Sequence, residues 1–195
     1  MPVPTCSADC STQLGAVKFS ECAPEINLSE IRRVFIAVGI AAAFADFGEA
    51  AEWVERISAA GTDPDAIRSL TVIGDKPAAT PVTRDISGGR QYAVGKDHTL
   101  NVSIDDTSDE NYEFMRNLEC GGQFRVWFET NGGKLYGGNE GILTRSVIFN
   151  DVLNRGVDEI ETIEGTISWR AKFHPDRTES PIFNQVFNGT ITPTP

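Results

Sequence analysis

The chain has 195 residues and a formal net charge of -11 at pH 7, with 40% hydrophobic and 23% charged residues. This length and composition suit one folded domain with a sizeable core, so we expect a single domain over residues 1–195. The acidic balance disfavours a protein that grips nucleic acid or anionic lipid through surface cations, and we expect no membrane association.

The two ends differ in composition from the rest. Residues 1–12 and 184–195 are rich in Pro, Ser, Thr and Asn, which predicts flexible arms that become ordered only against a partner. The four cysteines are Cys6, Cys10, Cys22 and Cys120. Their spacing leaves three states open: free thiols, disulfides that would hold the amino-terminal arm, or an all-cysteine metal site.

Residues 14–20 and 31–38 have the composition of strands, separated by a polar turn at residues 23–25. The uncharged run at residues 34–45 is too short and too rich in alanine to span a bilayer, so we interpret it as a buried strand followed by a loop.

A helix is expected next. Asp46 and Glu49 have the spacing of a capping box. The apolar positions that follow are Ala50, Trp53, Val54 and Ile57, in helical spacing before Gly61. We expect this face, Trp53 included, to be buried under a sheet.

Two strands follow, at residues 68–73 and 82–87, around the turn-rich sequence GDKPAATP. Residues 90–94 and 98–105 then predict a hairpin, because Leu100, Val102 and Ile104 alternate with polar residues. His98 stands at the start of this alternation, away from other metal-binding residues, and we interpret it as solvated or hydrogen-bonded.

Thr107 and Glu110 have the spacing of a second capping box. The helix buries a stripe of Phe114, Met115 and Leu118, and stops at Gly121 and Gly122. The aspartates at 105, 106 and 109 are better placed to cap this helix than to bind calcium.

Residues 124–129 alternate as a strand, Asn131-Gly132 predicts a type I′ turn, and residues 134–136 form the return strand. Residues 142–153 and 157–173 are the longest expected strands and should pair. In the second, apolar residues or glycine occupy every odd position from 163 to 173, which predicts one apolar, buried face and one polar, solvent-exposed face. The fold class is therefore mainly β (α+β): an antiparallel β sandwich or barrel with two flanking α-helices.

The sequence contains no catalytic, phosphate-binding or metal-binding motif of recognised spacing. We therefore expect no enzymatic activity and no cofactor. Long amphipathic strands, outer helices and flexible ends instead indicate a self-assembling β protein, whose sheets join neighbouring copies.

Several stretches resemble the major tail tube proteins of tailed bacteriophages and related injection machines, especially those of phages with Bacteroidota hosts. They are LGAVKFSECAPE, AEWVERIS, IRSLTVIGDKPA, LNVSIDDTSDENYEFMRNLE, VWFETNGGKLYGGNEGI and EGTISWRAKFHPDRTE. The resemblance implies a structural virion protein of the phage tail, assembled in the cytoplasm of the host bacterium as stacked, sixfold rings around a DNA channel.

In that arrangement Glu164 would face the channel, with Glu161 just before its strand, and their charge would let DNA slide without sticking. Arg170 and Lys172 share the face of Glu164, so they would lie near the rim or in a salt bridge between subunits. The amino-terminal arm and the loop containing Asp75, Lys76 and Pro77 would contact the next ring.

The expected partners are further copies of the chain, a tape-measure protein, DNA in passage and, in contractile tails, a sheath. Two alternatives remain open: another virion component, such as a head decoration, connector or tail-terminator protein, or a β barrel that binds a small molecule. An enzyme of unrecognised class is a third.

Overall fold

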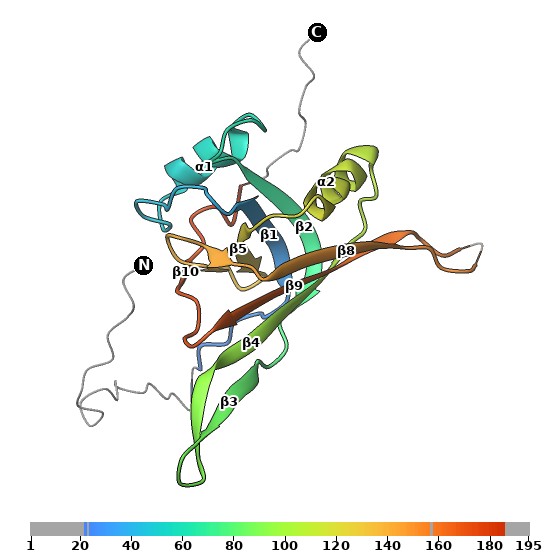
Figure 1. The fold of residues 1–195 in the computed structure, drawn as a ribbon. Coiled ribbons are helices and arrows are strands. Elements are labelled where there is room, and N and C mark those ends of the chain that lie inside the picture. Colours follow the sequence, from blue (N-terminus) through green and yellow to red (C-terminus); the bar gives the residue numbers. More distant parts are fainter. Residues whose placement is uncertain (1–21, 23, 157, 186–195) are drawn as a thin grey trace.

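The computed structural model describes residues 22, 24–156 and 158–185. In this part of the chain ten strands and two helices follow one another (Figure 1). They are β1 (Ile31–Val38), α1 (Ala50–Ser58), β2 (Ile67–Asp75), β3 (Thr80–Ile86), β4 (Arg90–Ile104), α2 (Asp109–Glu119), β5 (Phe124–Thr130), β6 (Lys134–Tyr136), β7 (Ile142–Leu143), β8 (Ser146–Val152), β9 (Thr162–Ala171) and β10 (Arg177–Glu179).

All the strands belong to one antiparallel sheet with the order β10-β6-β5-β1-β2-β4-β9-β8, and β3 and β7 pair with β4 and β5. The prediction of a mainly β, α+β fold with two helices is confirmed. The sheet is open, so a closed barrel is wrong. Figure 1 shows the β3–β4 hairpin extending beyond the rest of the sheet.

The sheet curls so strongly that strands far apart in its order approach one another. The N–H of Thr144 donates to the carbonyl of Phe124 at the start of β5, and the N–H of Arg145 donates to Ser168 in β9. The rings of Phe128 in β5 and Trp169 in β9 lie 6.4 Å apart. One sheet therefore encloses most of its own core.

Two hydrophobic clusters occupy the two faces of the sheet. The inner core lies within the curl and includes Val34, Val72, Val102, Phe128, Ile167 and Trp169, with Met115 and Leu118 of α2. The outer core contains Phe35, Phe44, Trp53, Ile67, Trp127 and Ile182. Strands β1 and β5 contribute to both cores, so both of their faces are buried, whereas β4, β9 and β8 contribute only to the inner core.

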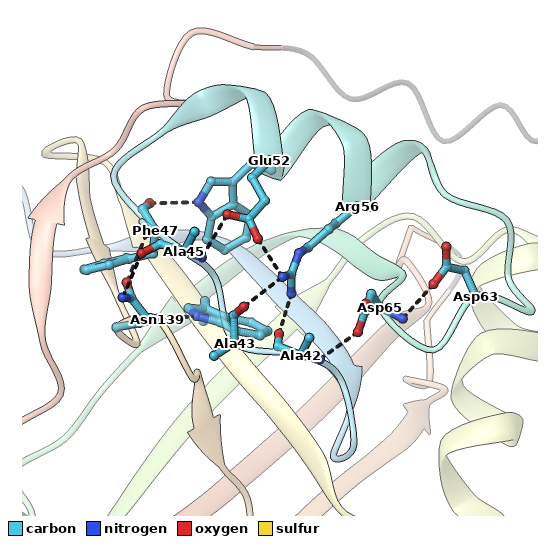
Figure 2. A network of polar contacts seen from close by, with 12 residues as sticks. Ala42, Ala43, Ala45, Phe47, Glu52, Arg56, Asp63, Asp65 and Asn139 are labelled. Atoms are coloured by element: carbon cyan, nitrogen blue, oxygen red, sulfur yellow. Dashed lines mark hydrogen bonds and ion pairs between the residues drawn. The ribbon is translucent and has the colours of Figure 1, made fainter. Parts of the chain in front are cut away.

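Helix α1 and the loop before it cover the outer core. Figure 2 shows the buried Arg56 of α1 donating to the carbonyls of Ala42 and Ala43 at 2.5 and 3.0 Å, and to Glu52 at 2.6 Å. The indole of Trp53 donates to the carbonyl of Phe47 at 2.8 Å. These bonds satisfy loop carbonyls and hold the loop over the tryptophan, whose predicted burial is confirmed.

A buried ion pair anchors the segment that follows β10. Arg33 of β1 donates to the carboxylate of Glu129 at 2.6 Å, and its guanidinium also reaches the carbonyls of Ile182, Phe183 and Gln185. Ser180 donates to the other oxygen of Glu129. Residues 184 and 185, expected to begin a flexible arm, are thus held against β1.

The expected hairpin at residues 90–105 is wrong, because β4 is one continuous strand that changes partners. Its first half pairs with β3 and its second half with β2 and β9. The register shifts where Val82 faces Gly95 and Thr83 faces Ala93. The glycine therefore marks a β-bulge and not a turn.

Two further strand predictions need correction. Residues 142–153 form two strands, β7 and β8, because the chain crosses from β5 to β9 at Thr144 and Arg145. The expected pairing of β8 with β9 is confirmed. The β5–β6 turn is not type I′, since Gly133 and not Asn131 or Gly132 has positive φ, at 74°. A three-residue loop closed by the Gly133 N–H on the Thr130 carbonyl replaces it.

Neither capping box forms. The helices start after Glu49 and Ser108, without a side-chain cap. Asp46 and Asp106 instead accept hydrogen bonds from the N–H groups of Gly48 and Ser108, two residues on, in the preceding turns. Val54 is exposed, whereas Met115 and Leu118 are buried as expected. The predicted strand at residues 14–20 and the arm at residues 1–12 lie outside the described residues.

Candidate functional site: the uncovered polar face of the sheet

Strands β4, β9 and β8 expose one face of the sheet. Because side chains alternate along a strand, the residues next to the buried ones in these strands all point outward. The register aligns them in rows: Ser103, Glu164 and Asn150; Asn101, Thr166 and Ile148; Thr99, Ser168 and Ser146. Each is exposed or half-buried. These three rows define the polar face, which no helix or hydrophobic cluster of the described residues accounts for.

Five of the nine residues of the polar face take part in side-chain hydrogen bonds. The hydroxyl of Ser103 donates to Glu164 at 2.8 Å, the hydroxyls of Ser146 and Ser168 lie 2.6 Å apart, and the amide of Asn101 donates to Asp75 at 3.3 Å. Thr99, Thr166 and Asn150 add exposed or half-buried hydroxyl and amide groups, so the face is polar along its length.

Arg170, which follows Ser168 by two residues on the same face of β9, is neutralised within the chain. Arg170 donates to both oxygens of Asp97, at 2.6 and 2.7 Å. This bidentate contact lowers the pKa of Asp97 and raises that of Arg170. Arg145 also approaches Asp97, at 3.5 Å. The expected place of Arg170 in a salt bridge between subunits is therefore unnecessary.

The structure places the other predicted site residues around this face. Glu164 lies on it, exposed, and Glu161 is exposed one residue before β9. Lys172 follows the end of β9, with its ammonium 5.6 Å from the ring of Phe173. Glu164 therefore lies on the polar face, and Lys172 lies beyond the end of β9.

The predicted ring-contact loop is shorter than expected. Asp75 is the last residue of β2, Thr80 already begins β3, and only residues 76–79 connect them. Asp75 reaches the edge of the polar face through its bond with Asn101. Partial burial and the charge of Lys96 lower the pKa of Lys76, and Pro77 follows in the same connection.

The interpretation of His98 as solvated or hydrogen-bonded is wrong. Its side chain is 1% exposed and stacks on Trp169 with ring centroids 5.2 Å apart. Within the described residues neither ring nitrogen has a hydrogen-bond partner. Burial is the main cause that lowers its pKa. The period of two could have found this, since His98 precedes Leu100 by two residues and shares its face.

The structure also bears on possible metal ligands and on the cysteines of the described part of the chain. No group of three or more His, Cys, Asp and Glu side chains there is placed to hold a metal ion. Cys22 and Cys120 are exposed free thiols, and Cys6 and Cys10 lie outside the described residues. In the same part of the chain, neither helix is long and apolar enough to cross a membrane.

Comparison of the chain with protein-family models, curated proteins and solved structures gives no match.

Proposed function

We propose that this chain is a structural subunit that assembles into stacked rings and forms the wall of a hydrophilic channel, as in the tail tube of a tailed bacteriophage. One observation carries the proposal: the uncovered polar face ends at a strand, β8, whose outer edge has no strand partner among the described residues.

The edge of β8 lacks the devices that usually keep a strand from pairing with another molecule. Its sequence, SVIFNDV, contains no proline and no lysine, and Asp151 is its one charge. The edge strand β3, TPVTRDI, by contrast carries Pro81, Arg84 and Asp85. A bare edge that joins a different surface of the next copy gives a head-to-tail contact, which closes into a ring when the rotation permits.

The charge of the polar face suits a channel for DNA. Glu164 and Asp75 have no cationic partner within 4.0 Å among the described residues, whereas Arg170 is paired with Asp97. A wall of hydroxyls, amides and unpaired carboxylates releases no counterions from DNA and therefore does not hold it. A tape-measure protein and DNA in transit are the expected occupants, and a sheath is the expected outer partner in contractile tails.

In the stacked arrangement Asp75, Lys76 and Pro77, together with the projecting β3–β4 hairpin, contact the next ring. The location is then the virion tail, after assembly in the host cytoplasm.

Negative-stain electron microscopy and sedimentation velocity of the concentrated pure chain test the proposal. Rings that stack into tubules are the expected result. Single rings that never stack would favour a connector, terminator or head decoration protein. A strict monomer at high concentration would contradict the proposal, and a ligand that raises its melting temperature would favour a small-molecule carrier instead.

A further inference from the structure

The inner side of the curl ends in basic residues near the end of β2. In β4, His98 is buried on the inner face, and the alternation of the strand places Lys96 on the same side. Lys76 follows directly after β2. Burial is the main cause that lowers the pKa of His98, and the charges of Lys76 and Lys96 lower it further, so the three residues lie near one another. Together with His174, which meets His98 edge-on, they form the basic end of the curl.

A groove of about 880 Å³ opens at the basic end. Lys76 and His174 line it, together with residues 27–31 and the aromatic rings of Phe128 and Tyr136. These two rings stack with their centroids 4.8 Å apart. The groove therefore combines an aromatic wall with basic groups, and its volume suits a small organic molecule.

The lysines of the basic end lack counterions among the described residues. Neither Lys76 nor Lys96 has a carboxylate oxygen within 4.0 Å there. Partial burial and the charge of Lys96 lower the pKa of Lys76, as expected where positive charges are held together. The two carboxylates that line the groove, Glu30 and Asp75, already accept hydrogen bonds from asparagine side chains. The positive charge of the basic end is therefore available to an anion from outside.

The basic end favours an anion over a metal ion. The rings of His98 and His174 lie 6.4 Å apart, and the nitrogens of His98 have no partner among the described residues, which is the start of a metal site. No third ligand completes it in that part of the chain, and the nearby ammonium groups repel a cation. The same ammonium groups attract an anion.

We propose that the groove binds a small organic anion with an aromatic body. The anionic oxygens lie beside Lys76 and His174, with Lys96 adding to the attraction, and the body lies against the rings of Phe128 and Tyr136. The site is on the inner side of the sheet, whereas the polar face is on the outer side. The inference concerns the single chain and does not depend on the proposed assembly.

A matched pair of fluorescent probes tests the inference on the dilute full chain. Anilinonaphthalene sulfonate carries an anion, and phenylnaphthylamine is the same aromatic body without it. We expect the sulfonate to bind to the groove about tenfold more tightly than the uncharged probe. Lys76→Gln should remove most of this difference by weakening only the sulfonate. The control Arg116→Gln removes the same charge from an exposed position on α2 and should leave both affinities unchanged.

Equal affinities of the two probes for the wild-type chain, or no binding of either probe, would overturn the inference. Unchanged sulfonate affinity in Lys76→Gln would overturn it as well, because the probe would then bind elsewhere. Hydrogen exchange locates the bound sulfonate independently: exchange should slow at residues 27–31 and 74–76 and stay unchanged in β8. Protection confined to other surfaces would also contradict the inference. An unchanged urea midpoint confirms that the Lys76 variant is folded, as expected for a substitution in the connection after β2.

Discussion

His98 is the residue whose surroundings are least compatible with its charged form. It stacks on Trp169 inside the sheet and meets His174 edge-on, with ring centroids 6.4 Å apart. Lys76 and Lys96 also disfavour a positive charge on it, and only Asp97 favours one. Its pKa in the folded chain therefore lies below its ordinary value of 6.5.

Acid should destabilise the fold through His98. Because the unfolded chain binds this proton more readily, stability is lost as the pH falls below about 6.5, by at most about 1.4 kcal/mol per pH unit. The loss ends below the pKa of the folded state. Urea unfolding between pH 7.5 and 5.5 measures this slope. His98→Phe keeps the stacking and should flatten the slope, whereas His174→Gln should leave most of it.

The buried pair of Arg33 and Glu129 should be sensitive to loss of one partner. Glu129 is 0% exposed and Arg33 is 5% exposed, so Glu129→Leu removes the carboxylate that balances the buried charge of Arg33, although the carbonyls of Ile182, Phe183 and Gln185 still accept its hydrogen bonds. We expect the free energy of unfolding to fall by about 3–5 kcal/mol. Asp97→Asn, which breaks the exposed pair with Arg170, is the control and should have a much smaller effect in the same urea titration. Equal losses of unfolding free energy in the two variants would show that the buried pair contributes no more to stability than the exposed pair.

Single residues, in the candidate site and in the core, differ in how far the sequence could predict their positions. The alternation around Glu164 placed it outward because β9 buries one face only. The same rule, applied to His98, would have placed it inside. Arg33 could not be placed in this way, because β1 is buried on both faces and its pattern has no period of two. Its partner Glu129 is also 96 residues away in sequence.

At the level of the strand, Gly165 lets β9 pass under a large aromatic ring. A Cβ atom built at this position would lie 2.3 Å from the ring of Phe149 and 2.7 Å from Val102. We expect Gly165→Ala to lower the free energy of unfolding by about 1–3 kcal/mol. Chemical denaturation measures it.

Gly95→Ala is the matched control, since the nearest atoms there lie at an ordinary 3.5 Å. If the ring causes the cost, Gly165→Ala should be less harmful by about 1 kcal/mol in a Phe149→Leu background. Strict additivity of the two changes would refute this explanation.

The edge strand β8 should decide assembly. Ile148 is 53% exposed on the polar face, opposite Thr166. Ile148→Lys places a charge at the edge, which disfavours pairing with another chain, so we expect monomers in sedimentation velocity. Ile40→Lys, at an 84% exposed position beyond β1, should leave assembly intact. Tubules formed by the Ile148 variant would exclude β8 as the joint.

The elements were predicted well where one strand keeps one set of partners, and poorly where it does not. The bounds of β1 and β6 match the sequence pattern. The sequence pattern predicts two strands in place of β4, because Gly95 interrupts the alternation. In the structure the strand continues through a β-bulge at this point. The sequence pattern predicts one strand in place of β7 and β8, because Thr144 and Arg145 are not typical turn residues. In the structure these two residues carry the chain from β5 to β9.

For the whole assembled molecule, the retention of DNA should depend more on where negative charge lies than on the total charge. Glu164→Lys and Glu55→Lys change the net charge equally, but Glu164 lies on the polar face and Glu55 is exposed on α1. We expect assembled Glu164→Lys protein to retain duplex DNA at low salt and release it as salt rises. Wild type and Glu55→Lys should not retain it. Equal retention by both variants would mean that the polar face does not line the channel.

The class of the fold followed from local patterns, but its closure did not. Alternating strands and short turns identify a mainly β chain. Whether a sheet closes depends on curvature and on hydrogen bonds between distant strands. Here β7 pairs with β5 through two residues only, and the sheet stays open. No local pattern in residues 142–145 encodes that outcome.

The central position of β1 also has a consequence for biosynthesis. Its partners are β2, which follows soon after, and β5, which begins only at Phe124. At a translation rate of about 5–20 residues per second, one flank of this apolar strand waits several seconds on the ribosome for its neighbour. A nascent chain stalled before residue 124 should therefore bind chaperones that recognise extended apolar segments, and one released after β5 should not.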